Sequence, residues 1–132
     1  MTAAVNFTVF GNPIPKARAR TVRTKNGRTV SFTPAETEMW ENTIYTSALP
    51  HRPAKLLEGA LILEATFYFC PPKNRPKNRV HPSVRPDLDN LTKAVCDALH
   101  GVIYANDSQI VEEHTKKRYD TTPRIEIVIR EA

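Results

Sequence analysis

Hydrophobic and polar positions follow recognisable patterns in four segments of this chain, and these patterns predict strands. Apolar residues alternate with polar ones over residues 5–9 and again over residues 123–130, with the period of two that is typical of a half-buried strand. Residues 60–69 form a strongly apolar run rich in β-branched and aromatic side chains, which favours a central strand. Residues 109–119 alternate less regularly and are also expected to form a strand. The alternating apolar residues are Val5, Phe7 and Val9 in the first segment and Ile125, Ile127 and Ile129 in the last.

A first helix is expected after the sequence "TPAE". Thr33 is a good N-cap, Pro34 suits the first helical position, and Glu36 completes a capping box. The helix should run to about Leu49 and bury one side, formed by Trp40, Ile44 and Ala48.

A second helix is expected in "DLDNLTKAVCDAL". Pro86 keeps Arg85 out of the helical conformation, so the helix should begin near Asp89 after an extended lead-in. Gly101 should end it. Its apolar residues recur at steps of three and four and predict a buried stripe of Leu88, Leu91, Val95, Ala98, Leu99 and Val102.

Turn residues separate these elements. Asn26-Gly27 lies between two β-prone arms and predicts a hairpin. Residues 71–86 are rich in proline and lack apolar periodicity, so they should form a long loop, and long loops in small domains are often functional or disordered. The expected fold is a single small α+β domain over residues 1–132, with a mixed or antiparallel sheet and two main helices.

Composition is that of an ordinary globular protein, with 132 residues, 40% hydrophobic and 25% charged. No stretch of 18 apolar residues and no secretory leader is visible, so we expect no membrane partner and a cytoplasmic location. Cys70 and Cys96 are isolated and are interpreted as reduced core thiols. The four histidines form no zinc motif.

The net charge of +5 is segregated along the chain. No acid occurs in residues 1–35 or in residues 65–86, and a third basic run follows at 116–118. Any one run could be a solvated loop, but two acid-free segments together favour a polyanionic partner. The basic residues in question include Lys16, Arg18, Arg20, Lys73, Arg75, Lys77, Arg79, Arg85, Lys116, Lys117 and Arg118.

The acids at the start of the second helix have two interpretations. As structural residues, Asp87 and Asp89 favour a helix N-terminus, and Asp89, Lys93 and Asp97 form a ladder of ion pairs. As functional residues, Asp87 and Asp89 would converge after an extended lead-in and suit a hard cation such as Mg²⁺. Asp107, in "NDSQ", could supply a third carboxylate. Such a cluster on a phosphate-binding protein is the setting for metal-assisted phosphodiester hydrolysis.

The segments "GNPIPKARAR", "RPDLDNLTKAVCDAL", "NDSQIVE" and "KKR" together resemble the RusA family of Holliday junction resolvases. The resemblance implies a homodimeric, Mg²⁺-dependent endodeoxyribonuclease, with Mn²⁺ as an expected substitute, that makes paired symmetric nicks in four-way DNA junctions during recombination and repair. Asp87, Asp89 and Asp107 match the family's metal-binding acids, and Lys93 matches its catalytic lysine. The family commonly has two adjacent acids where this chain has Asn106-Asp107, and Asp107 is taken as the ligand because it directly precedes Ser-Gln.

The resemblance also implies that the basic runs contact the phosphates of the junction arms, and that no small-molecule cofactor is needed. Two other interpretations stay open. A non-catalytic module could bind branched DNA and use the acid cluster only structurally. A nucleotide-sugar enzyme with an Asp-x-Asp metal site is disfavoured by the short chain and the absence of a βαβ repeat.

Overall fold

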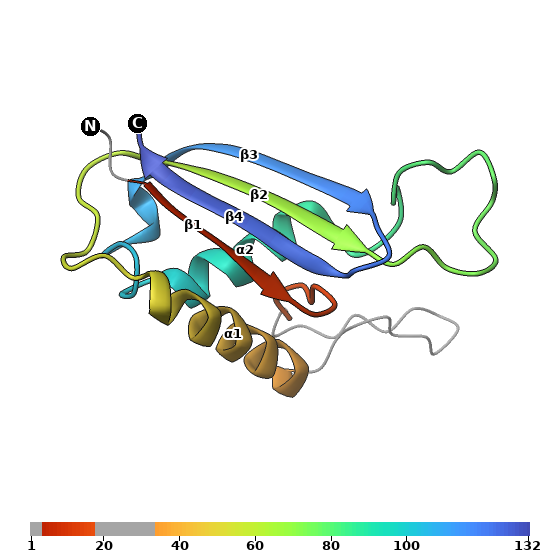
Figure 1. Cartoon of the computed structure of the whole chain (residues 1–132), viewed down its shortest axis with the longest axis horizontal. Helices are drawn as coiled ribbons and strands as arrows, with labels where there is room; N and C mark the ends of the chain where they lie inside the picture. The colour runs from red at the N-terminus through yellow and green to blue at the C-terminus, as the bar shows by residue number, and fades with distance from the viewer. Residues whose placement is uncertain (1–3, 18–33) are drawn as a thin grey trace, which may run out of the picture.

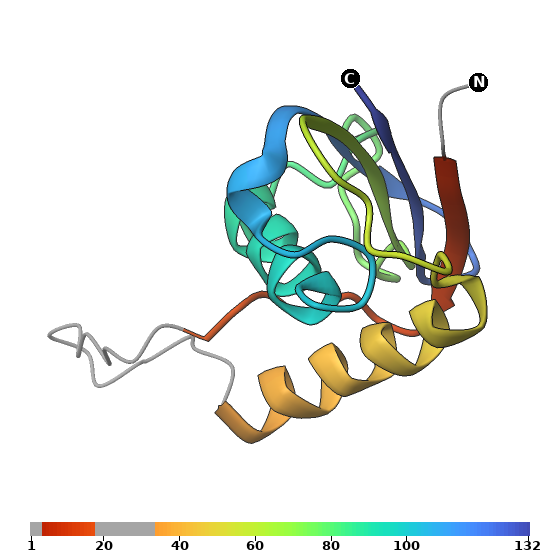
Figure 2. The ribbon, with the colours of Figure 1, turned by 90° about the vertical axis from the view of Figure 1, so that its left-hand side faces the viewer.

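A four-stranded sheet carries two helices on one of its faces (Figures 1 and 2). The computed structural model describes residues 4–17 and 34–132. The expected hairpin at Asn26-Gly27 and the N-cap Thr33 lie outside the described residues, as do Arg18 and Arg20. The strands are β1 (Ala4–Phe10), β2 (Leu61–Phe69), β3 (Ile110–Tyr119) and β4 (Arg124–Glu131). The helices are α1 (Pro34–Ala48) and α2 (Leu88–Leu99), with short 3₁₀ turns η1 (Leu49–His51) and η2 (Asp107–Gln109).

The strand order is β1-β4-β2-β3, and the sheet is mixed. β4 pairs antiparallel with both β1 and β2, whereas β2 pairs parallel with β3. The alternation in β1 and β4 places one apolar face of each strand inward, as predicted, and the run in β2 is a central strand as predicted. The core side chains of the sheet include Val9, Leu63, Phe67, Ile125, Ile127 and Ile129. The α+β class, the mixed sheet and the two main helices are therefore confirmed.

Helix α1 begins at the predicted proline and ends at Ala48, and 3₁₀ turn η1 then continues to His51. Trp40, Ile44 and Ala48 are buried, as the apolar spacing predicts. Both helices contribute to the same core cluster as the strands, because their apolar stripes cover one face of the sheet (Figure 2).

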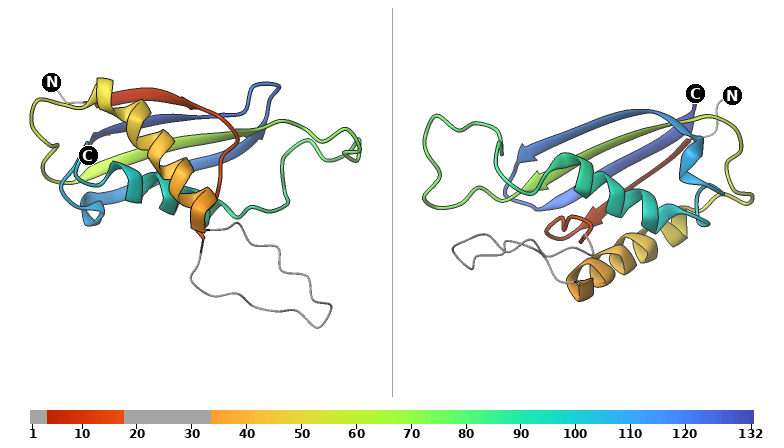
Figure 3. Two further views of the ribbon diagram at one scale, coloured as in Figure 1. Left: turned by 90° about the horizontal axis from the view of Figure 1, so that it is seen from below. Right: turned by 180° about the vertical axis from the view of Figure 1, so that it is seen from behind.

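Helix α2 is the connection between the parallel strands β2 and β3, which makes β2–α2–β3 a βαβ unit that the sequence pattern did not predict. Because parallel strands point the same way, the chain must travel back along α2 before β3 can begin. The helix therefore starts near the end of β2 and finishes near the start of β3 (Figure 3). The predicted stripe is confirmed, since Leu91, Val95 and Leu99 are fully buried.

The end of α2 also agrees with the sequence. The helix stops at Leu99, and Gly101 then adopts a positive φ of 80°, a left-handed conformation that side-chain-bearing residues rarely take. Val102 is buried just beyond this turn, so the apolar stripe continues past the helix itself.

The two cysteines differ in environment. Cys96 is buried in α2, and burial raises the pKa of its thiol to about 12, so it is a poor nucleophile. Cys70 is exposed, so the expectation that both thiols lie in the core is wrong for Cys70, which follows the last residue of β2.

Across residues 4–17 and 34–132, no helix is both long enough and apolar enough to cross a membrane.

Candidate active site

Asp87 is the residue that leads into α2. Its backbone is extended, with φ −76° and ψ 144°, and the helix begins at Leu88, so the extended lead-in inferred from Pro86 is confirmed. Among the described residues, the exposed Asp87 side chain makes no capping hydrogen bond to the helix that it precedes. Asp89 lies in the first turn, where its Oδ1 accepts the Asn90 backbone N–H at 2.9 Å. Two carboxylates thus stand at the N-terminal end of α2, where the helix dipole favours negative charge.

Asp107 lies at the opposite end of α2. It begins η2, and its Oδ1 is 3.4 Å from Nδ1 of His100, the residue that follows the helix. A helix of this length spans roughly 18 Å. The structure therefore brings Asp87 and Asp89 to one end of α2 but leaves Asp107, beside His100, at the other. Within the described parts of the chain, no three His, Cys, Asp or Glu side chains are grouped closely enough to hold a metal ion.

The pair Asp87 and Asp89 fits what Mg²⁺ requires from a protein. Mg²⁺ is commonly held by one or two carboxylates, with water and substrate phosphate oxygens completing its octahedron. Two exposed carboxylates beside a basic loop offer that donor set. A third carboxylate from Asp107 of the same chain does not fit, because α2 holds it too far away.

Lys93 lies one turn beyond Asp89 on α2 and is largely exposed. Its Nζ donates to Asp97 Oδ1 at 3.1 Å, so the Lys93–Asp97 part of the expected ladder is present. The other oxygen of Asp97 is 3.1 Å from Nζ of Lys16, which also donates to Glu41 of α1 at 2.8 Å. A chain of four alternating charges therefore joins the two helices beside the candidate site.

This charge chain shifts the pKa of two of its members. Hydrogen bonding to Glu41 is the largest cause that raises the pKa of Lys16 above its ordinary value. Partial burial by itself would raise the pKa of Asp97, but the hydrogen bonds from Lys16 and Lys93 outweigh it and hold that pKa below its usual range. Asp97 is consequently an ionised structural acid at neutral pH, in agreement with its expected structural role.

Apart from Lys16, which is paired with acids of α1 and α2, the predicted DNA-binding residues in the described structure lie in two regions. The loop of residues 70–87 projects beyond the ends of β2 and β3 and leads directly into Asp87 (Figure 1). It carries Lys73, Arg75, Lys77, Arg79 and Arg85. Lys73, Lys77 and Arg85 are exposed, whereas Arg75 stacks on the ring of Tyr119, with its guanidinium carbon 5.2 Å from the ring centre. Lys116, Lys117 and Arg118 lie near the end of β3.

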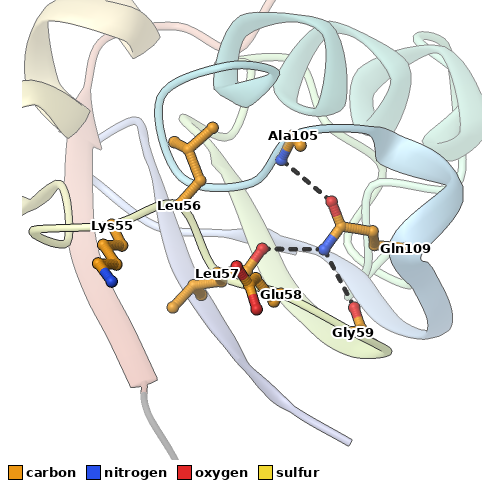
Figure 4. Close-up of a pocket in the computed structure, with 7 residues that line it drawn as sticks. All are labelled: Lys55, Leu56, Leu57, Glu58, Gly59, Ala105 and Gln109. Carbon is orange, nitrogen blue, oxygen red and sulfur yellow. Dashed lines mark hydrogen bonds between the residues drawn. The ribbon is translucent and has the colours of Figure 1, made fainter.

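Gln109 was not singled out in the sequence, yet its side chain fixes the segment that carries Asp107. Its Oε1 accepts the backbone N–H groups of Ala105 and Asn106, both at 3.0 Å. Its Nε2 donates to the carbonyls of Leu57 and Gly59 at 2.9 and 3.1 Å (Figure 4). Asn106 and Gln109 form a capping box around η2, and the Asn-x-x-Gln spacing was a signal that could have revealed it.

Comparison with known proteins places this geometry in a family. Residues 11–130, nearly the whole chain, match the family described as "Endodeoxyribonuclease RusA". The chain is also 32% identical over 137 residues to the uncharacterized protein YqaN of Bacillus subtilis (strain 168), with 96% of each chain covered. The protein is therefore a member of a family of endodeoxyribonucleases. It belongs to the RusA family, as the motifs around Asp87 and Asp107 indicated.

The first prediction concerns Gln109. Gln109→Ala removes two hydrogen bonds to the segment before β2 and two to the backbone just before η2, and we expect a loss of about 2 kcal/mol in the free energy of unfolding. Urea denaturation measures the loss. Ser108→Ala, an exposed neighbour, is the matched control and should cost less than about 0.5 kcal/mol. Equal losses for the two variants would show that Gln109 is an ordinary surface residue.

The second prediction concerns Asp97 and pH. A carboxylate whose pKa is lowered by folding stabilises the protein fully above its unfolded-state pKa of about 3.9, and this contribution is lost as the pH falls through the folded-state pKa. The difference in unfolding free energy between wild type and Asp97→Asn should therefore be constant near neutral pH and shrink below about pH 4. Asn42→Ala, an exposed change on α1 without a titrating group, should give a constant difference. A constant difference for Asp97→Asn as well would contradict the ion-pair assignment.

Proposed function

We propose that this protein is a Mg²⁺-dependent endonuclease that resolves four-way DNA junctions by paired symmetric nicks. The observation that carries the proposal is the placement of Asp87 and Asp89 at the start of α2, at the base of a basic loop, in a chain of an endodeoxyribonuclease family. Asp87 makes no side-chain capping hydrogen bond within the described structure, so its exposed carboxylate does not hold the helix end through such a bond.

Asp87 and Asp89 would hold the ion, and Mn²⁺ should substitute for it. The bound ion would polarise the scissile phosphate and lower the pKa of a water molecule. Lys93, one helical turn from Asp89, would place its ammonium against negative charge that develops on the phosphate. Its exposed, flexible side chain can leave Asp97, because Asp97 keeps Lys16 as a second cationic partner.

We further propose that the active form is a homodimer. Two symmetric nicks require two active sites related by a two-fold axis, which a C₂ dimer supplies. In a dimer, Asp107 would still be able to act as the predicted third ligand. Within one chain α2 keeps Asp107 away from Asp87 and Asp89, but this separation does not apply to Asp107 of a second copy. The exposed loop bases Lys73, Lys77 and Arg85 would contact junction phosphates, where contacts position the DNA without reading its sequence.

A non-catalytic module that binds branched DNA is the alternative, and the acid pair separates the two functions. Asp87→Asn keeps the shape of the side chain but removes a charge from the ion site. We expect single-turnover cleavage of a labelled four-way junction in Mg²⁺ to fall below about one hundredth of the wild-type rate, while junction binding without Mg²⁺ survives.

The control for Asp87→Asn is Glu58→Gln, an exposed acid in the segment before β2, at the other end of the sheet (Figure 1). It removes the same charge and should leave cleavage unchanged. Wild-type protein that binds the junction equally with and without Mg²⁺ but does not cleave it would support the non-catalytic module instead.

The loop of residues 70–87 should dominate the salt dependence of binding. A protein that makes about six phosphate contacts loses roughly a thousandfold in affinity between about 50 and 200 mM salt. Reversing Lys73 and Lys77 to Glu should weaken junction binding and flatten the plot of log affinity against log salt. Reversing Arg52 and Lys55 to Glu, both exposed in the segment between η1 and β2, makes the same change in charge at the opposite end of the sheet and serves as the control. A slope that is the same in the loop variant and in wild type would exclude the loop from the interface.

A further inference from the structure

Lys116 and Lys117 are neighbours in one basic run, but β3 turns them to opposite faces of the sheet. Lys116 pairs with Thr66 of β2, and Lys117 pairs with the fully buried Phe67. Because paired residues share a face, Lys117 lies on the face that the helices cover, and Lys116 lies on the other. The exposure agrees, since Lys116 is exposed and Lys117 is partly buried.

The ammonium of Lys117 is bound to the loop that leads into the candidate site. Its Nζ donates to the carbonyl oxygen of Val84 at 2.8 Å and to that of Pro86 at 2.9 Å. The Pro86 carbonyl belongs to the same peptide unit as the N–H of Asp87. Two charge-assisted hydrogen bonds of this length therefore connect β3 to the backbone immediately before the first acid of the site.

The stacking of Arg75 on Tyr119 ties the first part of the loop to β3, but the backbone hydrogen bonds of the loop between described residues do not reach the sheet. The backbone hydrogen bonds from Arg75 to Pro72, from Arg79 to Pro76 and from Ser83 to His81 are local turns. Such bonds shape the loop but leave its distance from β3 undetermined. The Lys117 ammonium, in contrast, reaches from the strand to the two carbonyls on either side of Arg85.

We propose that Lys117 is a positioning residue for Asp87, and that it is not a phosphate contact. Its two hydrogen bonds hold the entrance of α2 in the extended conformation that aims the Asp87 carboxylate. Lys116, on the exposed face, retains the role of a cation available to DNA. The inference rests on the proposed function, since it assigns Lys117 to the ion site formed by Asp87 and Asp89.

Three variants test this assignment. Lys117→Met keeps the aliphatic stem and removes both hydrogen bonds, whereas Lys117→Arg restores N–H donors and the charge. Lys116→Met is the matched control on the opposite face. For each variant we would measure amide hydrogen exchange at residues 84–89 without metal or DNA, the affinity for Mg²⁺ by calorimetry, and junction affinity in EDTA.

Lys117→Met should speed exchange at residues 84–89 and weaken Mg²⁺ binding by about 10- to 100-fold, the usual effect of losing a group that orients a ligand. Its junction affinity should stay within about threefold of wild type, and Lys117→Arg should recover Mg²⁺ binding. Lys116→Met should show the reverse, with weaker junction binding and unchanged Mg²⁺ affinity. If Lys117→Met weakens junction binding as Lys116→Met does and leaves Mg²⁺ affinity unchanged, Lys117 is a phosphate contact and the proposal fails.

A measurement on the wild-type protein covers the case in which Lys117→Met does not fold. The NMR signal of the Lys117 ammonium should stay in place when a short four-way junction is added without metal, while that of Lys116 shifts. Equal shifts of both signals would overturn the proposal.

Wild-type protein that neither cleaves junctions nor binds Mg²⁺ would overturn the proposed function. Hydrogen exchange in Lys117→Met would still decide separately whether Lys117 anchors the entrance of α2.

Discussion

The parallel pairing of β2 with β3 is the constraint on which the placement of the candidate site depends. Parallel neighbours require the chain to return along the sheet, and α2 makes this return while burying its apolar stripe against the strands. The start of α2 is thereby placed beside the ends of β2 and β3, together with the basic loop that precedes it. The same constraint sends Asp107 to the far end of the helix. The parallel pairing of β2 with β3 therefore places Asp87 and Asp89 beside the basic loop and places Asp107 away from them.

Some basic residues of this protein bind partners within the molecule, and others are exposed to a polyanionic partner. Only the structure distinguishes the two groups. Lys16 joins α1 to α2 through Glu41 and Asp97, and Lys117 holds the entrance of α2 through two backbone carbonyls. Arg75 stacks on Tyr119 and ties the loop to the end of β3. These cations have intramolecular partners, so the excess of basic residues in the sequence overstates the number available to a polyanion.

Local patterns in the sequence were sufficient for most of the elements. Pro34 and the Trp40 stripe defined α1, and Gly101 marked the end of α2, because caps and periodicity act over a few residues. The β2–β3 pairing depends on which strands meet across about fifty residues, and no local pattern encodes that choice. The motifs group Asp107 with Asp87 and Asp89 because the order of residues carries no distance, whereas the length of α2 separates them. Charge alone groups Lys116 with Lys117, whereas the alternation of faces along β3 separates them.

The acid pair at the base of the basic loop is difficult to explain in a protein that only binds DNA. Two carboxylates beside the cations that attract phosphates repel the same phosphates at short range, so they would weaken binding in the absence of an intervening cation. A divalent ion removes this conflict, because Mg²⁺ takes oxygen ligands from carboxylates and from phosphates at once. Under the proposed function the acids and the basic loop would be complementary: the loop would bring the DNA backbone to the start of α2, and the carboxylates would hold the ion that the backbone meets there.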